Sequence, residues 1–343
     1  MHIQNKEQNS KNAPTKDEVD LNNESNIMNY LFSFLILICF TGTAFLILNL
    51  ETYWSSRISY MPENYKLPQL TDFKIVLIAL PILCLFKYTF LRFVEPFMYK
   101  YVLSMKYKDE SNTQNFSLGF TYSKKLTINF LKAIYYTFSS IFAYTVSKNL
   151  IFMPIELFGN GDMQNIFING IPNYIFWEKP LYFDIYYLTA LSYTLTDLIW
   201  LLFIYEKQTD FILMLLHHSI TISLVVFSFL TNFSQIGIIV FFLHDLTDIV
   251  VYLTRIIINT DFVEWFKFTF CAFFLFSYIY LRIYVFGKLI YTVAINVDLT
   301  VPSVTLMLFK CILMIMHIYW VFEILKRFWY FKIDDVGKVK KKK

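Results

Sequence analysis

Two neighbouring histidines, His217 and His218, are followed by a His-Asp-x-x-Asp pattern formed by His244, Asp245 and Asp248. All five residues fall inside long apolar segments. Even on lenient insertion scales, an Asp at the centre of a membrane helix costs about 2.5–3.5 kcal/mol of insertion free energy. Such groups normally face a cavity and each other. An imidazole is nucleophilic near neutral pH, and a neighbouring carboxylate can fix its tautomer and stabilise the imidazolium. The pattern therefore predicts acyl transfer.

The elements that must position these residues are two apolar segments, 211–230 and 235–257, which a short connection joins. They must pack as antiparallel neighbours, and folding this hairpin places His217 at the depth of Asp248. The ionisable residues of the second segment are three and four positions apart, so they share one helix face. His217 lies about 9 Å along its helix, within reach of a substrate from the cytosolic leaflet.

Two other interpretations of this cluster stay open. The polar residues could serve only as hydrogen bonds between helices. Histidines and an Asp could also bind a single Zn²⁺ in a hydrolase, whereas the two-metal centre of membrane hydroxylases uses about eight histidines. This chain has only five histidines, and its four cysteines all fall in apolar segments. The sequence therefore argues against a two-metal centre and favours a site without metal over a single Zn²⁺, and we predict no disulfide framework and no bound cofactor.

Composition places these residues in a membrane protein. The 343 residues are 57% hydrophobic and 16% charged, which excludes soluble multidomain and mainly disordered classes. Eight apolar segments approach the roughly 20 residues that cross a bilayer, and none alternates like a barrel strand. The sequence thus predicts an all-α bundle of about eight transmembrane helices. They are residues 28–50, 74–95, 126–147, 181–204, 211–230, 235–257, 264–290 and 303–329.

Basic residues gather on one set of connections and after the last helix, which predicts that both termini are cytosolic. Five regions follow from this topology. They are a disordered cytosolic tail (1–27), two N-terminal transmembrane helices (28–95), a basic cytosolic loop (96–125), a catalytic domain (126–330) and a basic cytosolic tail (331–343).

Residues Asp210–Asp248 resemble the Lag1 motif of the ceramide synthases, the catalytic branch of the TLC-domain membrane proteins. An Asp-Phe, the paired His, a Ser-aromatic-x-x-Asn step, a Gly and His-Asp-x-x-Asp all stand at family spacing. The resemblance extends forward through Arg282 and Met316–Trp320, and back to Ala79–Lys100. It implies that the last six helices form a TLC domain around an intramembrane cavity. Gln235, Tyr252 and Arg255 depart from the family pattern.

The resemblance implies N-acylation of a sphingoid base by a fatty acyl-CoA, giving ceramide or dihydroceramide in the endoplasmic reticulum membrane. The base would be sphinganine, sphingosine or phytosphingosine. Acyl-CoA would be a co-substrate, membrane lipids would be partners, and we expect no nucleic acid. The resemblance leaves a homo- or hetero-oligomer open. A non-enzymatic TLC-type protein that binds lipid or assists translocation is the alternative.

Residue roles are implied by the same resemblance. His217 would accept the acyl group, and His218 and His244 would handle protons. Asp245 and Asp248 would orient imidazoles and help to deprotonate the base. Three further residues would support substrate or structure: Asn232, Arg282 and His317.

Charged residues outside the cluster allow both a functional and a purely structural interpretation. Lys124, Lys125 and Lys207 are candidates to meet the CoA phosphates, although the positive-inside rule alone explains them. Asp197, inside an apolar segment, is expected to have a polar partner. The C-terminal run Lys340–Lys343 fits a dilysine retrieval signal or a lipid-binding tail.

Overall fold

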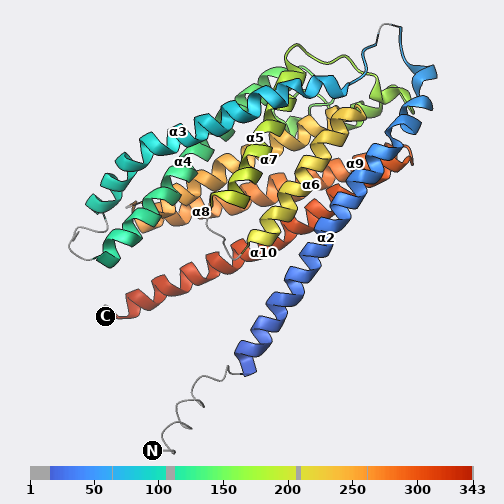
Figure 1. The fold of residues 1–343 in the computed structure, drawn as a ribbon. Coiled ribbons are helices and arrows are strands. Elements are labelled where there is room, and N and C mark those ends of the chain that lie inside the picture. Colours follow the sequence, from blue (N-terminus) through green and yellow to red (C-terminus); the bar gives the residue numbers. More distant parts are fainter. Residues whose placement is uncertain (1–15, 64, 106–112, 206–209, 261, 342–343) are drawn as a thin grey trace, which may run out of the picture.

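The computed structural model describes residues 16–341 except 64, 106–112, 206–209 and 261, and this part is helical without a named strand (Figure 1). The long helices are α2 (Lys16–Ser55), α3 (Lys74–Met105), α4 (Thr113–Ser147), α5 (Phe183–Phe203), α6 (Phe211–Leu230), α7 (Ser234–Ile258), α8 (Glu264–Tyr278), α9 (Phe286–Asn296) and α10 (Val301–Lys341). A π-helical segment, η6 (Ile279–Val285), joins α8 to α9. Short 3₁₀ turns are η1 (Ile58–Tyr60), η2 (Leu70–Phe73), η3 (Ile155–Leu157), η4 (Met163–Phe167) and η5 (Asn173–Ile175).

The predicted all-α membrane bundle is confirmed. Seven of the eight predicted crossings coincide with helical stretches long and apolar enough to span a bilayer. The predicted crossing 126–147 lies in α4, which is long enough but is not one of those seven stretches. Its sequence explains the difference, because Asn129 and Lys132 interrupt the apolar residues and both side chains are buried against neighbouring helices.

Several helices run beyond the predicted crossings. α2 begins at Lys16, inside the segment expected to be a disordered tail (1–27), of which 1–15 lie outside the described residues. Most of the predicted loop 96–125 is helix, because α3 continues to Met105 and α4 begins at Thr113. α10 likewise continues through the predicted tail to Lys341. Helices can extend in this way because these stretches contain few breakers; even Pro96 is accommodated within α3.

The connections divide into two ends of the bundle. The loop end consists of residues 56–73, 148–182, 231–233 and 297–300, and hydrogen bonds between these segments show that they lie together. The beginning of α2 and the end of α10 lie at the opposite end, as an even number of passes requires (Figure 1).

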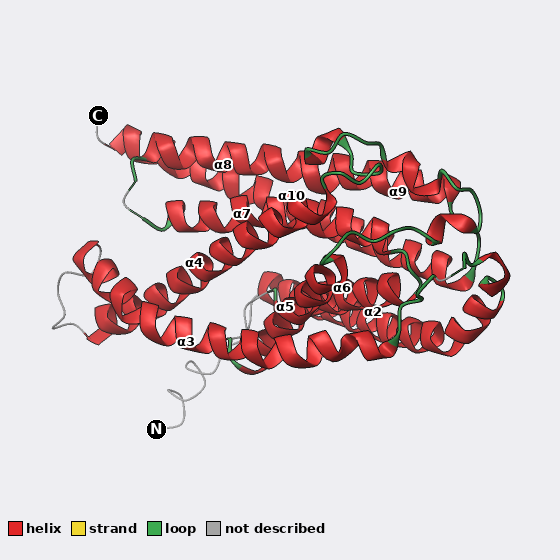
Figure 2. Ribbon diagram, turned by 90° about the horizontal axis from the view of Figure 1, so that it is seen from above, coloured by secondary structure: helices red, strands yellow, loops and turns green. Residues whose placement is uncertain are grey.

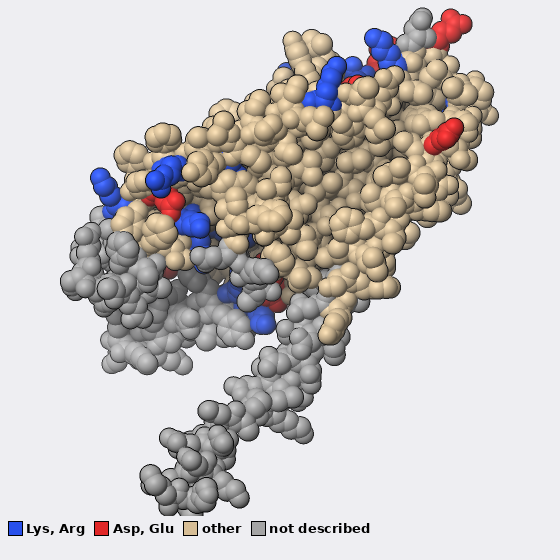
Figure 3. Space-filling model, in the orientation of Figure 1, with Lys and Arg blue, Asp and Glu red and all other residues tan. Residues whose placement is uncertain are grey.

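The bundle places α7 at its centre. α7 packs along α4 on one side and against α6, α8 and η6 on others, while α2 covers α6 and α10 (Figure 2). On the face that Figure 3 shows, the charged side chains gather near the two ends and the belt between them is almost uncharged. Large apolar side chains are exposed on the long helices, including Leu77 and Phe93 on α3 and Phe276 on α8. Such a continuous apolar surface suits contact with lipid.

Candidate active site in the membrane

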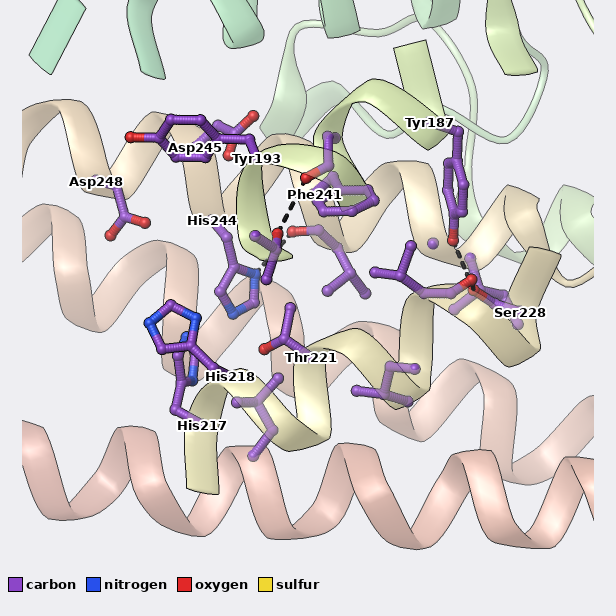
Figure 4. A pocket seen from close by; sticks show the side chains of 18 of the residues that line it. Tyr187, Tyr193, His217, His218, Thr221, Ser228, Phe241, His244, Asp245 and Asp248 are labelled. Carbon is purple, nitrogen blue, oxygen red and sulfur yellow. Dashed lines mark hydrogen bonds between the residues drawn. The ribbon is translucent and has the colours of Figure 1, made fainter. Parts of the chain in front are cut away.

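A cavity opens between α4, α5, α6, α7 and α10 (Figure 4). Its volume is about 100 Å³, counted as the space that the centres of water-sized molecules can occupy. Its wall holds all five residues of the predicted HH and HDxxD patterns, so the structure brings them together around one space: His217, His218, His244, Asp245 and Asp248. We call these five residues, together with His317, the histidine cluster. The rest of the wall is mainly aliphatic and aromatic.

His217 and His218 are the unpaired members of the cluster. The Nδ1 atoms of both rings are buried, and neither has a hydrogen-bond partner among the residues that the structure describes. The His217 ring packs edge-on against Trp320, with ring centroids 5.3 Å apart, and against His218 at 5.6 Å. Aromatic packing therefore fixes the position of the His217 ring while leaving a nitrogen free, which is what a nucleophile requires.

His244 belongs instead to a chain of hydrogen bonds. Its Nδ1 lies 2.7 Å from the Val240 carbonyl oxygen, which can only accept, so Nδ1 carries the proton. The unprotonated Nε2 then accepts from His317 Nε2 at 2.9 Å, and His317 Nδ1 accepts from the Tyr278 hydroxyl at 3.3 Å. This relay occupies both His244 nitrogens, so His244 is less available as a nucleophile than His217.

The two carboxylates of the cluster do not pair with imidazoles in the described structure. Asp245 accepts from the Ser139 hydroxyl at 2.5 Å and from the Tyr186 hydroxyl at 3.4 Å. Asp248 forms an ion pair with Arg282 at 2.5 Å. The implied role of these residues in orienting imidazoles therefore has no direct contact to support it.

Arg282 reaches the cluster from the π-helical segment η6. Its Nη2 donates to Asp248 Oδ1 and, at 3.3 Å, to the His244 carbonyl oxygen. A π-helix inserts an extra residue into the helical register and is frequent at functional sites. Arg282 therefore neutralises a partly buried carboxylate and ties η6 to α7, while its supporting role stays a prediction.

A second buried charge cluster lies beside His218. Asp197 accepts from Lys87 at 2.5 Å and from Lys132 at 2.7 Å, and it also lines the cavity. The polar partner expected for Asp197 is therefore present, and it joins α3, α4 and α5. Lys132 also reaches the Tyr252 hydroxyl at 3.3 Å, so one departure from the family pattern contacts this cluster.

Sequence reasoning did not single out Lys87, Lys132 or Lys310, although each is a buried lysine within a predicted crossing. The criterion used for the histidines, an ionisable group in an apolar segment, would have found all three. Ser139 was missed for a different reason, because a serine in a membrane helix gives no signal by itself.

Three further predicted residues, Asn232, Lys124 and Lys125, lie away from the cluster. Asn232 is at the loop end, where its side-chain amide donates to the Tyr65 hydroxyl at 2.5 Å and to the Ile175 carbonyl oxygen. Lys124 and Lys125 lie on α4 about 20 Å along the helix from Ser139. Lys207 is outside the described residues. In the part of the chain that the structure describes, no three His, Cys, Asp or Glu side chains are grouped to hold a metal ion.

This fold and site define a polytopic membrane protein with an ionisable cluster in an intramembrane cavity. A family profile described as the TLC domain matches residues 125–326, and the chain belongs to this family. It is 30% identical over 166 residues to ceramide synthase LOH2 from Arabidopsis thaliana, covering 45% of this chain and 54% of that protein. It is 38% identical over 71 residues to ceramide synthase 5 from Mus musculus, covering 21% and 16%. The matched part is thus about half of the first relative and less of the second.

Proposed function

We propose that the protein is an acyltransferase of the ceramide synthase type, which transfers a fatty acyl group from acyl-CoA to the amine of a sphingoid base. The observation that carries the proposal is the unpaired His217 imidazole, held by Trp320 at an otherwise mainly apolar cavity. The similarity to two proteins named ceramide synthases supports it. The cavity suits acyl chains, and the histidine suits a thioester.

The first step forms an acyl-imidazole. A His217 nitrogen attacks the thioester carbonyl, a carbon–nitrogen bond forms, the carbon–sulfur bond breaks and the CoA thiolate leaves. The imidazole loses its proton as it acylates, and the thiolate takes up a proton. His218 is adjacent in the same cavity wall and is the proposed carrier of this proton.

The second step forms the amide. The base enters as an ammonium, gives one proton to Asp248, and attacks the acyl-imidazole carbonyl, whereupon the bond to His217 breaks. Asp248 is suited to accept the ammonium because only its Oδ1 is hydrogen-bonded to Arg282. The second proton of the nitrogen passes to the released His217 nitrogen, which restores the neutral imidazole. His244 has both nitrogens hydrogen-bonded, so we propose that its relay to His317 and Tyr278 assists this proton transfer without receiving the proton directly from the base. Asp245, held by Ser139, is proposed to stabilise positive charge nearby.

The surroundings of the reaction are part of the same proposal. We propose that the protein lies in the endoplasmic reticulum membrane with both termini in the cytosol. Acyl-CoA is soluble in the cytosol, and Lys124 and Lys125 would attract its phosphates from that side. Sphinganine, sphingosine and phytosphingosine are the candidate bases.

Intact-mass measurement of purified protein after incubation with one acyl-CoA tests the mechanism. We expect one acyl adduct in the wild type, none in His217→Ala, and an unchanged adduct in Ser219→Ala, whose residue lies on the same helix outside the cavity wall. Adding sphinganine must discharge the adduct and yield the amide. An adduct that persists in His217→Ala contradicts the nucleophile. Lipid binding without amide for any acyl length favours the non-enzymatic alternative.

A further inference from the structure

Lys310 lies in the wall of the same cavity but takes no part in the proposed chemistry. Its side chain comes from α10, is 4% exposed, and has no hydrogen-bond or ion-pair partner among the described residues. A buried ammonium without a partner is costly, so it is normally paired or hydrogen-bonded. This is the feature of the cavity that an apolar acyl chain alone does not explain.

Helix geometry places Lys310 relative to the reacting groups. It precedes His317 by seven residues on α10, which is about 10 Å along the helix toward the loop end. The neighbouring wall is apolar and includes Leu306, Leu313 and Val225. The amine therefore faces the part of the cavity that a chain attached to His217 would occupy beyond its carbonyl.

A second unpaired polar group lies between these positions. The Thr221 hydroxyl has no hydrogen-bond partner and lines the cavity one helical turn beyond His217, about 6 Å toward the loop end (Figure 4). Beyond both groups, the Tyr187 hydroxyl and Ser228 Oγ pair with each other at 2.6 Å. Thr221 and Lys310 are thus two polar groups without partners among the described residues in the wall of a mainly apolar cavity.

Resting on the proposed function, we propose that Lys310 binds an oxygen substituent in the middle of the acyl chain, with Thr221 as its neighbour. The ligand class is an acyl chain that carries a hydroxyl or another oxygen about 10 Å from its thioester carbon. A hydrogen bond to a charged donor stabilises by more than a neutral one. An unsubstituted chain would leave the amine unpaired beside methylene groups, which disfavours it.

Competition between matched acyl-CoAs tests this inference, with sphinganine as acceptor. The substrates are palmitoyl-CoA and its isomers that carry one hydroxyl at successive chain positions. We expect the wild type to prefer a mid-chain isomer about tenfold or more in kcat/KM. Lys310→Met should lose this preference and use palmitoyl-CoA better, and Lys310→Gln should retain part of it. Lys326→Met, on an exposed site of the same helix, should behave like the wild type.

Other outcomes overturn the inference or separate it from the proposed function. Equal use of all isomers by the wild type, or the same preference in Lys310→Met, contradicts the subsite while leaving the acyltransferase intact. If Lys310→Met fails to fold, an unchanged preference in Lys310→Gln and in Lys310→Ala contradicts it. If no acyl-CoA yields amide, the proposed function fails. In that case, native mass spectrometry measures how much palmitate and hydroxypalmitate the wild type and the Lys310 variants bind. Equal binding of these fatty acids by the wild type and the variants contradicts the subsite.

Discussion

The loop end and the histidine cluster are both rich in buried polar groups, but they differ in how these groups are paired. At the loop end, Asp298 pairs with Arg57 and also accepts from Tyr174 at 2.6 Å and Ser303 at 3.1 Å. Burial raises the pKa of the Tyr174 hydroxyl, which keeps it protonated as a donor. In the cluster, His217 and His218 each keep an unpaired nitrogen.

The difference separates stability from chemistry. Paired buried charges at the loop end join the segment after α2 to the turn between α9 and α10, and removing one partner would leave the other buried alone. An unpaired imidazole contributes little to stability but remains available to a substrate. Substitutions in the histidine cluster should therefore lower activity with little change in stability. Substitutions at the loop end should mainly lower the free energy of unfolding.

The largest expected effect is on activity in the histidine cluster. His217→Ala should lower amide formation by about a thousandfold or more, because it removes the proposed nucleophile. Its thermal unfolding midpoint should stay close to that of Ser219→Ala. Mass-spectrometric product assays and thermal unfolding in detergent measure the two quantities. A large loss of stability in His217→Ala would remove the contrast between the regions.

The next effect is on stability at the loop end. Asp298→Ala should cost about 3–5 kcal/mol because Arg57, whose side chain is 6% exposed, would lose its ion-pair partner. Denaturant unfolding gives this value. Asp184→Ala is the matched control, since its pair with Lys179 is 44% exposed on the Asp side and should cost far less. The double variant Arg57→Met/Asp298→Leu should regain most of the loss, and its failure to do so contradicts the pairing argument.

The relay between the histidines should show an intermediate effect on activity. His317→Phe removes the donor to His244 Nε2 and should slow amide formation about ten- to hundredfold, within the range of a proton-transfer contribution. Tyr278→Phe removes only the longer bond of 3.3 Å and should have a smaller effect. Single-turnover assays that start from the acylated enzyme measure the affected step. Equal effects of both variants on enzyme acylation alone would contradict a relay role in the second step.

The smallest expected effect concerns Asn232, which adopts a left-handed backbone conformation with φ of 61°. Asn232→Ala should cost about 1–3 kcal/mol, because it adds backbone strain to the loss of hydrogen bonds to Tyr65 and Ile175. Asn232→Gly should cost less, because glycine tolerates this φ. Denaturant unfolding distinguishes the two. An alanine variant as stable as the glycine variant would show that backbone conformation is not important there.

The sequence predicts much of the histidine cluster but none of the paired charges at the loop end. Helix number, the hairpin and the convergence of His217 and Asp248 follow from apolar segment length and spacing. The partners of the carboxylates do not follow, because Ser139 and Arg282 come from helices far away in sequence. The loop-end pairs were also inaccessible, since Arg57 and Asp298 are 241 residues apart and lie outside any motif.

The segment η6 gives the site an unusual tolerance to a change in chain length. A π-helical turn contains one residue more than the α-helix it interrupts. Deleting a single residue within Ile279–Val285 would therefore restore a regular helix and keep α8 and α9 in phase, instead of rotating one of them by about 100°. A deletion before Arg282 would turn its guanidinium away from α7, and Asp248 would lose its counter-charge. A one-residue deletion in η6 would thus act on the charge balance of the site while keeping the helical register of its surroundings.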